Sequence, residues 1–267
     1  MEQIIESVNL ILLSGPAVLL PENPLYQLLL LLLITLGGVL ITISVHLIPV
    51  GGAPAAMAQA TGVGTGTTQL AAGAGLTGLL VAVSIYLLSE NPLLCILLGG
   101  IGSAIMIAIV MLVSNIGYIY GIGITPASGK AVRDPITKDR QDIYVSKGTE
   151  GHGIPTAAFF SGIAGGIVGG IGGSLIFVAL LKATGLPTAA TALTMPDAVI
   201  LSIALFFINS VIASYNIGGT IEGFYDPKFK KLPKAAIVSA IITFICGILC
   251  LFIMIQFAGF GLMEEFA

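Results

Sequence analysis

The chain has 267 residues, of which 9% are charged, a mean hydropathy of +1.07 and a formal net charge of −3. A soluble domain carries about 25% charged residues, so this composition excludes an ordinary water-soluble fold. The slightly negative charge also excludes the broad basic field of a nucleic-acid-binding protein. We therefore predict an all-α fold, a polytopic membrane helix bundle with about six transmembrane helices.

The first 25 residues are predicted to form an N-terminal extension that lies at the membrane interface or is half inserted. Their apolar run is short for a span and is broken at Gly15 and Pro16. The acidic start, with Glu2 and Glu6, lacks the basic region of a secretory signal, so we expect this segment to be retained. Residues 26–267 are predicted to form a single transmembrane domain.

Six apolar stretches follow, each long enough to cross about 30 Å of hydrocarbon. None has an Asp, Glu, Lys or Arg in its interior, and Gly, Pro and Asn turn signals separate them. The predicted spans are approximately 26–47, 69–88, 92–118, 155–181, 198–217 and 234–257.

Basic residues predict the orientation of these spans. Six spans place the loops 48–68, 119–154 and 218–233 on one side of the membrane, and nine of the ten basic residues lie in or beside the last two of these loops. By the positive-inside rule this side is cytoplasmic, and both termini are extracellular. If residues 4–20 also spanned, the N-terminus alone would change sides. The nine residues are Lys130, Arg133, Lys138, Arg140, Lys147, Lys228, Lys230, Lys231 and Lys234.

The segment between the first two spans is uncharged and rich in Gly, Ala and Thr. A solvated loop is normally more polar, and hydrocarbon does not tolerate unsatisfied backbone groups. We expect this segment either to pack within protein or to line a wet cavity, where its oxygens could serve a hard cation. The predicted lining of this cytoplasmic cavity is His46, Gly51, Gly52, Gln59, Thr61, Gly62, Gly64, Thr65, Gly66 and Thr67.

The fourth span carries two rows of glycine at four-residue spacing, which predict close helix packing. Two packed faces on one helix also suggest a bundle that continues into neighbouring subunits. The rows are Gly162, Gly166 and Gly170, and Gly165, Gly169 and Gly173.

The fifth span carries a polar stripe, because Ser202, Asn209 and Asn216 are spaced by seven residues. An asparagine in the bilayer must find a partner, so the stripe indicates either hydrogen bonds between helices or one wall of an ion path. Asp197 follows Pro196 and is predicted to cap the outer start of this helix. The candidate ion-path residues are Asp197, Ser202, Asn209, Asn216 and Glu222.

No independent catalytic centre is indicated. The sequence contains no Ser-His-Asp set, HExxH motif or dinucleotide fingerprint, and neither His46 nor His152 has a metal-spaced partner. Three cysteines, Cys95, Cys246 and Cys250, lie in apolar runs. Cys246 and Cys250 share one helix face at four-residue spacing, which indicates packing, with a redox-active pair as the alternative.

One long motif resembles a known family. The runs HLIPVGGAPAAM (46–57) and ATGVGTGTTQLAAGAGLTG (60–78) are similar to the D subunit of tetrahydromethanopterin S-methyltransferase. The shorter motifs MLVSN (111–115), DPIT (134–137) and GHGIP (151–155) match the same family. The resemblance extends from about Leu30 to Met254.

This resemblance implies an integral membrane subunit of a complex in methanogenic archaea. The complex moves a methyl group from methyl-tetrahydromethanopterin to coenzyme M and drives sodium ions out of the cell. The implied partners are the lipid bilayer, the C and E membrane subunits, and the A subunit, which carries the corrinoid (cobamide) cofactor. On this expectation the chain helps to form the sodium path and the cytoplasmic cavity, with sodium ligands still unknown.

Two alternatives stay open. The chain could be a purely structural scaffold, with ion and substrate sites in partner subunits, because no span has an internal charge. A stand-alone secondary transporter also fits the composition.

Overall fold

The structure is a computed structural model that describes residues 24–50, 73–146, 151–185 and 188–257. It is all-α apart from one short antiparallel pair of strands, in which Ala127 pairs with His152 and Ser128 with Gly151. The helices are α2 (Pro24–Leu47), α5 (Leu76–Ser89), α6 (Pro92–Ile116), α7 (Thr156–Lys182), α8 (Thr188–Ile217) and α9 (Leu232–Phe257). Shorter elements are the π-helix η1 (Gly117–Ile122), the strands β1 (Ala127–Ser128) and β2 (Gly151–His152), and the 3-10 helix η2 (Pro227–Lys231).

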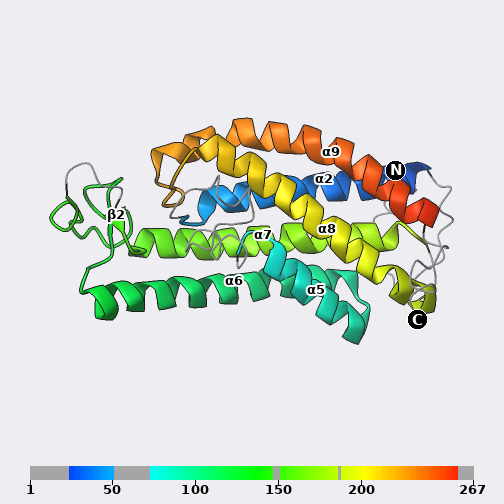
Figure 1. The fold of residues 1–267 in the computed structure, drawn as a ribbon, viewed down its shortest axis with the longest axis horizontal. Coiled ribbons are helices and arrows are strands. Elements are labelled where there is room, and N and C mark those ends of the chain that lie inside the picture. The colour runs from blue at the N-terminus through cyan, green and yellow to red at the C-terminus, as the bar shows by residue number, and fades with distance from the viewer. Residues whose placement is uncertain (1–23, 51–72, 147–150, 186–187, 258–267) are drawn as a thin grey trace.

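The helices lie side by side along the long axis of the molecule (Figure 1). In this view α9, α2, α7 and α6 follow one another across the bundle, and α8 packs on α2, α7 and α9. Helix α5 lies beside α6 and α7. The core contains large side chains from several helices, including Ile34, Ile41, Phe177 and Phe206. The outward sides of α6 and α9 expose leucine and isoleucine, as expected of helices that face lipid or other apolar surfaces.

Five helical stretches of the described chain are long and apolar enough to cross a membrane. They start at Pro24, Pro92, Thr156, Thr194 and Pro227 and have 24 to 31 residues. The prediction of a polytopic helical membrane protein is therefore confirmed.

The second predicted span is shorter than expected. Its described helix, α5, has 14 residues, or about 21 Å at 1.5 Å per residue, against about 30 Å of hydrocarbon. The helical path is interrupted at Ala74 and Gly75, and Gly75 has φ +134°, which L side chains rarely adopt. The prediction of six full-length spans is thus corrected to five long helices and one short one among the described residues. Residues 69–72 of the predicted span lie outside them.

Helix α8 starts earlier than the sequence suggested. It begins at Thr188 and continues through Pro196, so Asp197 lies inside the helix and does not cap its start. The prediction of a cap was wrong because Pro196 resembles the first-turn proline that often opens a helix. Asp197 is half-buried and has no hydrogen-bond or ion-pair partner among the described residues.

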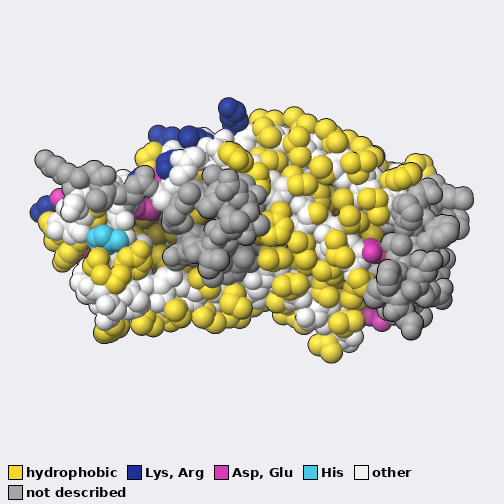
Figure 2. All heavy atoms as spheres, viewed as in Figure 1, with side chains coloured by type: hydrophobic (Ala, Val, Ile, Leu, Met, Phe, Trp, Pro, Cys, Tyr) yellow, Lys and Arg dark blue, Asp and Glu magenta, His cyan; other side chains and the backbone are white. Residues whose placement is uncertain are grey.

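The two basic loops lie at the same end of the bundle and touch each other. Ser128 and Gly129 of the loop after α6 donate hydrogen bonds to Glu222 of the loop after α8. Val50, just after α2, pairs with Ile221 as an isolated bridge. Figure 2 shows the visible Lys and Arg side chains gathered toward this end, next to a surface that is otherwise mainly hydrophobic.

The glycines of α7 let neighbouring helices approach its backbone closely. A Cβ on Gly165 would lie 3.1 Å from the carbonyl oxygen of Ser44 in α2, and one on Gly166 would lie 3.0 Å from the Cα of Ala104 in α6. The row of Gly165, Gly169 and Gly173 faces α2 and the chain leading into α5, and the row of Gly162, Gly166 and Gly170 faces mainly α6. Both rows pack within this chain, so they give no indication of a bundle that continues into neighbouring subunits.

Candidate functional site

Asn209 lies at the centre of a polar cluster that joins α2, α8 and α9. Its side-chain oxygen accepts hydrogen bonds from Ser239 at 2.5 Å and Thr243 at 2.9 Å, both on α9. Its amide nitrogen donates to the carbonyl of Leu205 at 2.8 Å, and Thr42 of α2 donates to the carbonyl of Asn209 at 3.4 Å. Thr42, Asn209, Ser239 and Thr243 are fully buried. The cluster is therefore a satisfied hydrogen-bond network between three helices.

Asn216 and His46 meet near the basic end of the bundle. The amide nitrogen of Asn216 lies 3.1 Å from Nε2 of His46 and donates to the carbonyl of Lys231 at 3.0 Å. Nδ1 of His46 lies 2.8 Å from the carbonyl of Thr42, which can only accept. Nδ1 therefore carries the proton and Nε2 accepts from Asn216, so the fully buried His46 is a neutral imidazole in this arrangement.

A second set of polar groups starts at Ser202, on the Asn209 side of α8, and turns away from it. Ser202, Ser210 and Ser214 lie on a row with four-residue steps, and Phe206 occupies the position between the first two. Each step rotates about 40° around the helix axis, so Ser210 and Ser214 reach another side of α8. All four side chains are at most 1% exposed. Ser202 donates to the carbonyl of Ala198 at 2.6 Å, whereas Ser210 and Ser214 have no hydrogen-bond partner among the described residues.

Glu222 joins the two basic loops. Its carboxylate accepts hydrogen bonds from the hydroxyl of Ser128, from Tyr225 at 3.1 Å and from the backbone of Gly129 at 3.4 Å. Burial raises the pKa of Glu222 above its usual range, and the nearby Asp226 acts in the same direction, although the three hydrogen bonds oppose the shift. This junction connects the loop after α8 to the lobe between α6 and α7.

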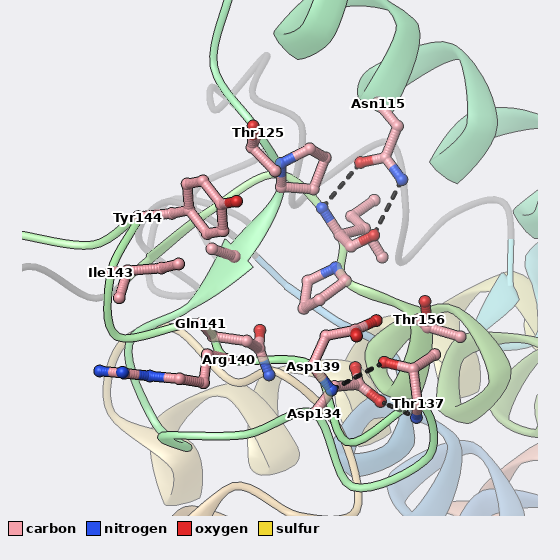
Figure 3. Close-up of a pocket in the computed structure, with 14 residues that line it drawn as sticks. Asn115, Thr125, Asp134, Thr137, Asp139, Arg140, Gln141, Ile143, Tyr144 and Thr156 are labelled. Atoms are coloured by element: carbon pink, nitrogen blue, oxygen red, sulfur yellow. Dashed lines mark hydrogen bonds between the residues drawn. The ribbon is translucent and has the colours of Figure 1, made fainter.

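That lobe, residues 123–146 and 151–155, contains a pocket of about 500 Å³ at its contact with α6 and α7. Figure 3 shows Asn115 of α6 bonded to both backbone groups of Ile154, at 2.7 and 2.8 Å. On the other side of the pocket, Asp134 accepts from the backbone of Ile136, Thr137 and Ala157. Desolvation opposes ionisation of Asp134, but these hydrogen bonds together lower its pKa. Asp134 thus holds the lobe against the first turn of α7.

The predicted ion-path residues do not form one site. Asn209 and Asn216 both join α8 to its neighbours, Ser202 bonds within α8, and Glu222 belongs to the loop junction. Asp197 is in the half of α8 away from the basic loops. Among the predicted cavity residues, only His46 belongs to the described part of the chain, and the nine between Gly51 and Thr67 lie outside it.

Sequence patterns alone did not indicate the partners on α9 or the pocket in the lobe. Ser239 and Thr243 are spaced by four residues on one side of an apolar helix, which was an available signal. The pocket is lined by residues from the three short family motifs, among them Asn115, Asp134 and Ile154. Among the described residues, no three or more His, Cys, Asp or Glu side chains lie close enough together to hold a metal ion.

Five long apolar helices with a buried polar network and basic loops at one end define a multi-pass α-helical membrane protein. The family model MtrD, which describes the D subunit of tetrahydromethanopterin S-methyltransferase, matches residues 27–243. The D subunit of Methanosarcina barkeri is 54% identical over 236 residues, which cover 85% of this chain and 94% of the relative. The D subunit of Methanopyrus kandleri is 52% identical over 224 residues (84% and 95%), and that of Methanocaldococcus jannaschii is 50% identical over 219 residues (80% and 92%).

The chain therefore belongs to the MtrD family of tetrahydromethanopterin S-methyltransferase subunits, and it is a membrane subunit of this methyltransferase complex. The resemblance inferred from the sequence motifs is confirmed.

Proposed function

We propose that this chain is an energy-coupling subunit of the methyltransferase, and that α8 forms part of the path by which sodium ions leave the cell. In this proposal, transfer of the methyl group from methyl-tetrahydromethanopterin to coenzyme M proceeds through the corrinoid of the A subunit. The C and E subunits complete the membrane part. Sodium is the transported substrate.

The observation that carries the proposal is the concentration of buried polar side chains on α8. Ser202, Asn209, Ser210 and Ser214 are at most 1% exposed within a helix that is long and apolar enough to span the bilayer. Polar groups at membrane depth are costly, and they commonly mark an ion or substrate pathway. Hydroxyl and amide oxygens are also suitable ligands for a hard cation.

The proposed orientation places the basic end in the cytoplasm, by the positive-inside rule. The methyl-transfer partners would then meet the loops at this end, together with the predicted cavity at residues 46–68. The Glu222–Ser128 contact supports a mechanical connection, because it ties the loop that follows α8 to the lobe between α6 and α7. Movement of a partner subunit docked on the lobe would then be transmitted through this contact to α8.

A scaffold remains the second candidate, and a specific observation favours it. The hydrogen-bonding groups of the Asn209 side chain are already paired with protein groups, so this cluster can stabilise helix packing without binding an ion. On this account the ion ligands would belong to partner subunits.

The test is sodium uptake by vesicles that contain the whole complex, normalised to methyl transfer. Asn209→Ala and Asp197→Ala are made singly, with Ser84→Ala as a matched control because, among the described residues, its hydroxyl bonds within its own helix, to the carbonyl of Leu80. We expect either path variant to lower the number of sodium ions moved per methyl group, and the control to leave it unchanged. Normal ratios for both path variants would assign these residues to structure alone.

A further inference from the structure

The serines of α8 differ in how their hydroxyls are satisfied. A helical serine or threonine normally donates to the carbonyl four residues earlier, and Thr35, Ser84, Ser114, Ser174 and Ser202 all do so here. Ser210 and Ser214 do not, and they have no other partner among the described residues. A buried hydroxyl without a partner costs about 1–3 kcal/mol, so this pair needs an explanation.

Position along α8 separates the satisfied serine from the unsatisfied ones. Ser214 lies about 4.5 Å and Ser210 about 10 Å along the axis from Ile217, the last residue of the helix at its basic end. Ser202 lies beyond Phe206, on the far side. Thr220, in the loop after α8, has a hydroxyl that also lacks a partner among the described residues. Unpaired hydroxyls therefore extend from the basic end to Phe206 and stop there.

Phe206 fills the centre of the bundle at this boundary. Its ring is fully buried. A Cβ on Gly75, at the start of α5, would lie 3.3 Å from the Phe206 ring, 3.0 Å from Ile41 of α2 and 3.0 Å from the carbonyl oxygen of Gly169. The ring thus lies where α2, α7 and the start of α5 meet, and the side of α8 that carries Phe206 faces this junction.

We propose that Ser210 and Ser214 are sodium-binding hydroxyls in the half of the path that opens at the basic end, and that Phe206 closes the inner end of this half in the arrangement described. The proposal rests on the proposed function and identifies which side of α8 the ion contacts. Both hydroxyl oxygens are out of reach of solvent here, so sodium reaches them from the basic end only when the packing around Ser210 and Ser214 themselves loosens. The ion or its water then supplies the missing partners.

Ser103 marks a different case among the unpaired serines. It is also fully buried and lacks a partner in the described part of the chain, but it packs against Gly170, where a Cβ would already lie 2.8 Å from its hydroxyl. The close contact of α6 and α7 fills the space around the Ser103 hydroxyl, so Ser103 is not included in the proposed site.

The test is the sodium dependence of methyl transfer by the whole complex carrying S210A/S214A. We expect the KM for sodium to rise about tenfold, because two ligands to a charged species are lost, while kcat at saturating sodium is retained. Ser114→Ala is the matched control, since its hydroxyl bonds the carbonyl of Val110 in α6. A wild-type KM in the double variant would overturn the proposal.

A second measurement covers the case in which the double variant does not assemble. Ser214→Cys and Ala213→Cys are placed separately in the complex, and each is treated with a small cationic thiol reagent from the basic side. Ala213 is equally buried but lies one turn from Asn209. We expect Ser214→Cys to react faster and sodium to slow its reaction. Equal rates at both positions, or no effect of sodium, would overturn the proposal.

The serine proposal and the proposed function fail in different ways. If the serine variants behave as wild type while Asn209→Ala or Asp197→Ala lowers the sodium-to-methyl ratio, then α8 lines the path by another side. If all of these variants transport normally, the proposed function itself fails.

Discussion

Two sides of α8 carry buried polar groups, but the groups on only one of them have hydrogen-bond partners among the described residues. On one side, Asn209 is bonded to Ser239 and Thr243, and Thr42 bonds its carbonyl. On the other, Ser210 and Ser214 are equally buried and have no partner among the described residues. Burial of a polar group in a membrane helix therefore has to be considered together with its hydrogen bonds. A satisfied group such as Asn209 joins helices whether or not it also lines a path, whereas an unsatisfied group that no close helix contact explains is a candidate for contact with an ion or water.

The largest effect is expected at Phe206, which separates the hydrogen-bonded Ser202 from Ser210 and Ser214, unpaired among the described residues. Phe206→Ala removes a fully buried ring where three segments meet, and a cavity of this kind costs about 3–5 kcal/mol. The unfolding temperature of the purified complex measures the loss. Variants that assemble should also leak sodium without methyl transfer. Unchanged stability would show that the ring does not fill the centre of the bundle.

The next largest effect is expected at Asn209, on the side of α8 whose polar groups are hydrogen-bonded. Asn209→Ala leaves Ser239 and Thr243 without their acceptor, which should cost about 1–3 kcal/mol. Thermal unfolding measures this effect, with Ser84→Ala as a control near zero. If Asn209→Ala and the control unfold at the same temperature, the cluster does not stabilise the bundle, and the two sides of α8 do not differ in this respect.

The opposite change in stability is expected when Ser210 and Ser214 are replaced. S210A/S214A removes two buried hydroxyls that have no partner among the described residues, so stability should stay the same or rise by up to about 1 kcal/mol. The same unfolding measurement, made without sodium, checks this. A clear loss of stability would mean that these hydroxyls have bonding partners within the protein.

The smallest effect concerns the loop junction. Since burial raises the pKa of Glu222 in the folded protein, the protonated form is favoured there. Protonated Glu222 therefore contributes to the free energy of unfolding. This contribution is fully present below the unfolded-state pKa of Glu222 and is lost as pH rises through its folded-state pKa. Glu222→Gln should remove this part of the pH dependence. Unfolding temperatures measured from acidic to neutral pH check it, and parallel profiles for the variant and wild type would contradict it.

Sequence patterns predicted the helical class, the apolar spans and the polar stripe on α8, because hydropathy and spacing are local properties. They did not predict that Asn209 bonds Ser239 and Thr243, since pairing between separate helices depends on how those helices pack. The start of α5 was missed because Gly75 interrupts an otherwise continuous apolar run. Asp197 was misplaced because Pro196, inside α8, resembles a helix start.

The lobe shows a different limit. Asn115, Asp134 and Ile154 belong to three separate motifs that the sequence linked only through family resemblance. The structure brings them around one pocket, where Asn115 and Asp134 bond backbone groups far from them in the chain. Such contacts to backbone groups leave no pattern of side-chain types in the sequence.

A structure of the assembled complex at high sodium concentration would show whether this chain contributes ligands to the sodium path. We expect density for an ion or its water within about 3 Å of the Ser210 or Ser214 hydroxyl, a hydrogen-bonding distance. Ion density held only by partner subunits, with both hydroxyls still enclosed and dry, would contradict this expectation.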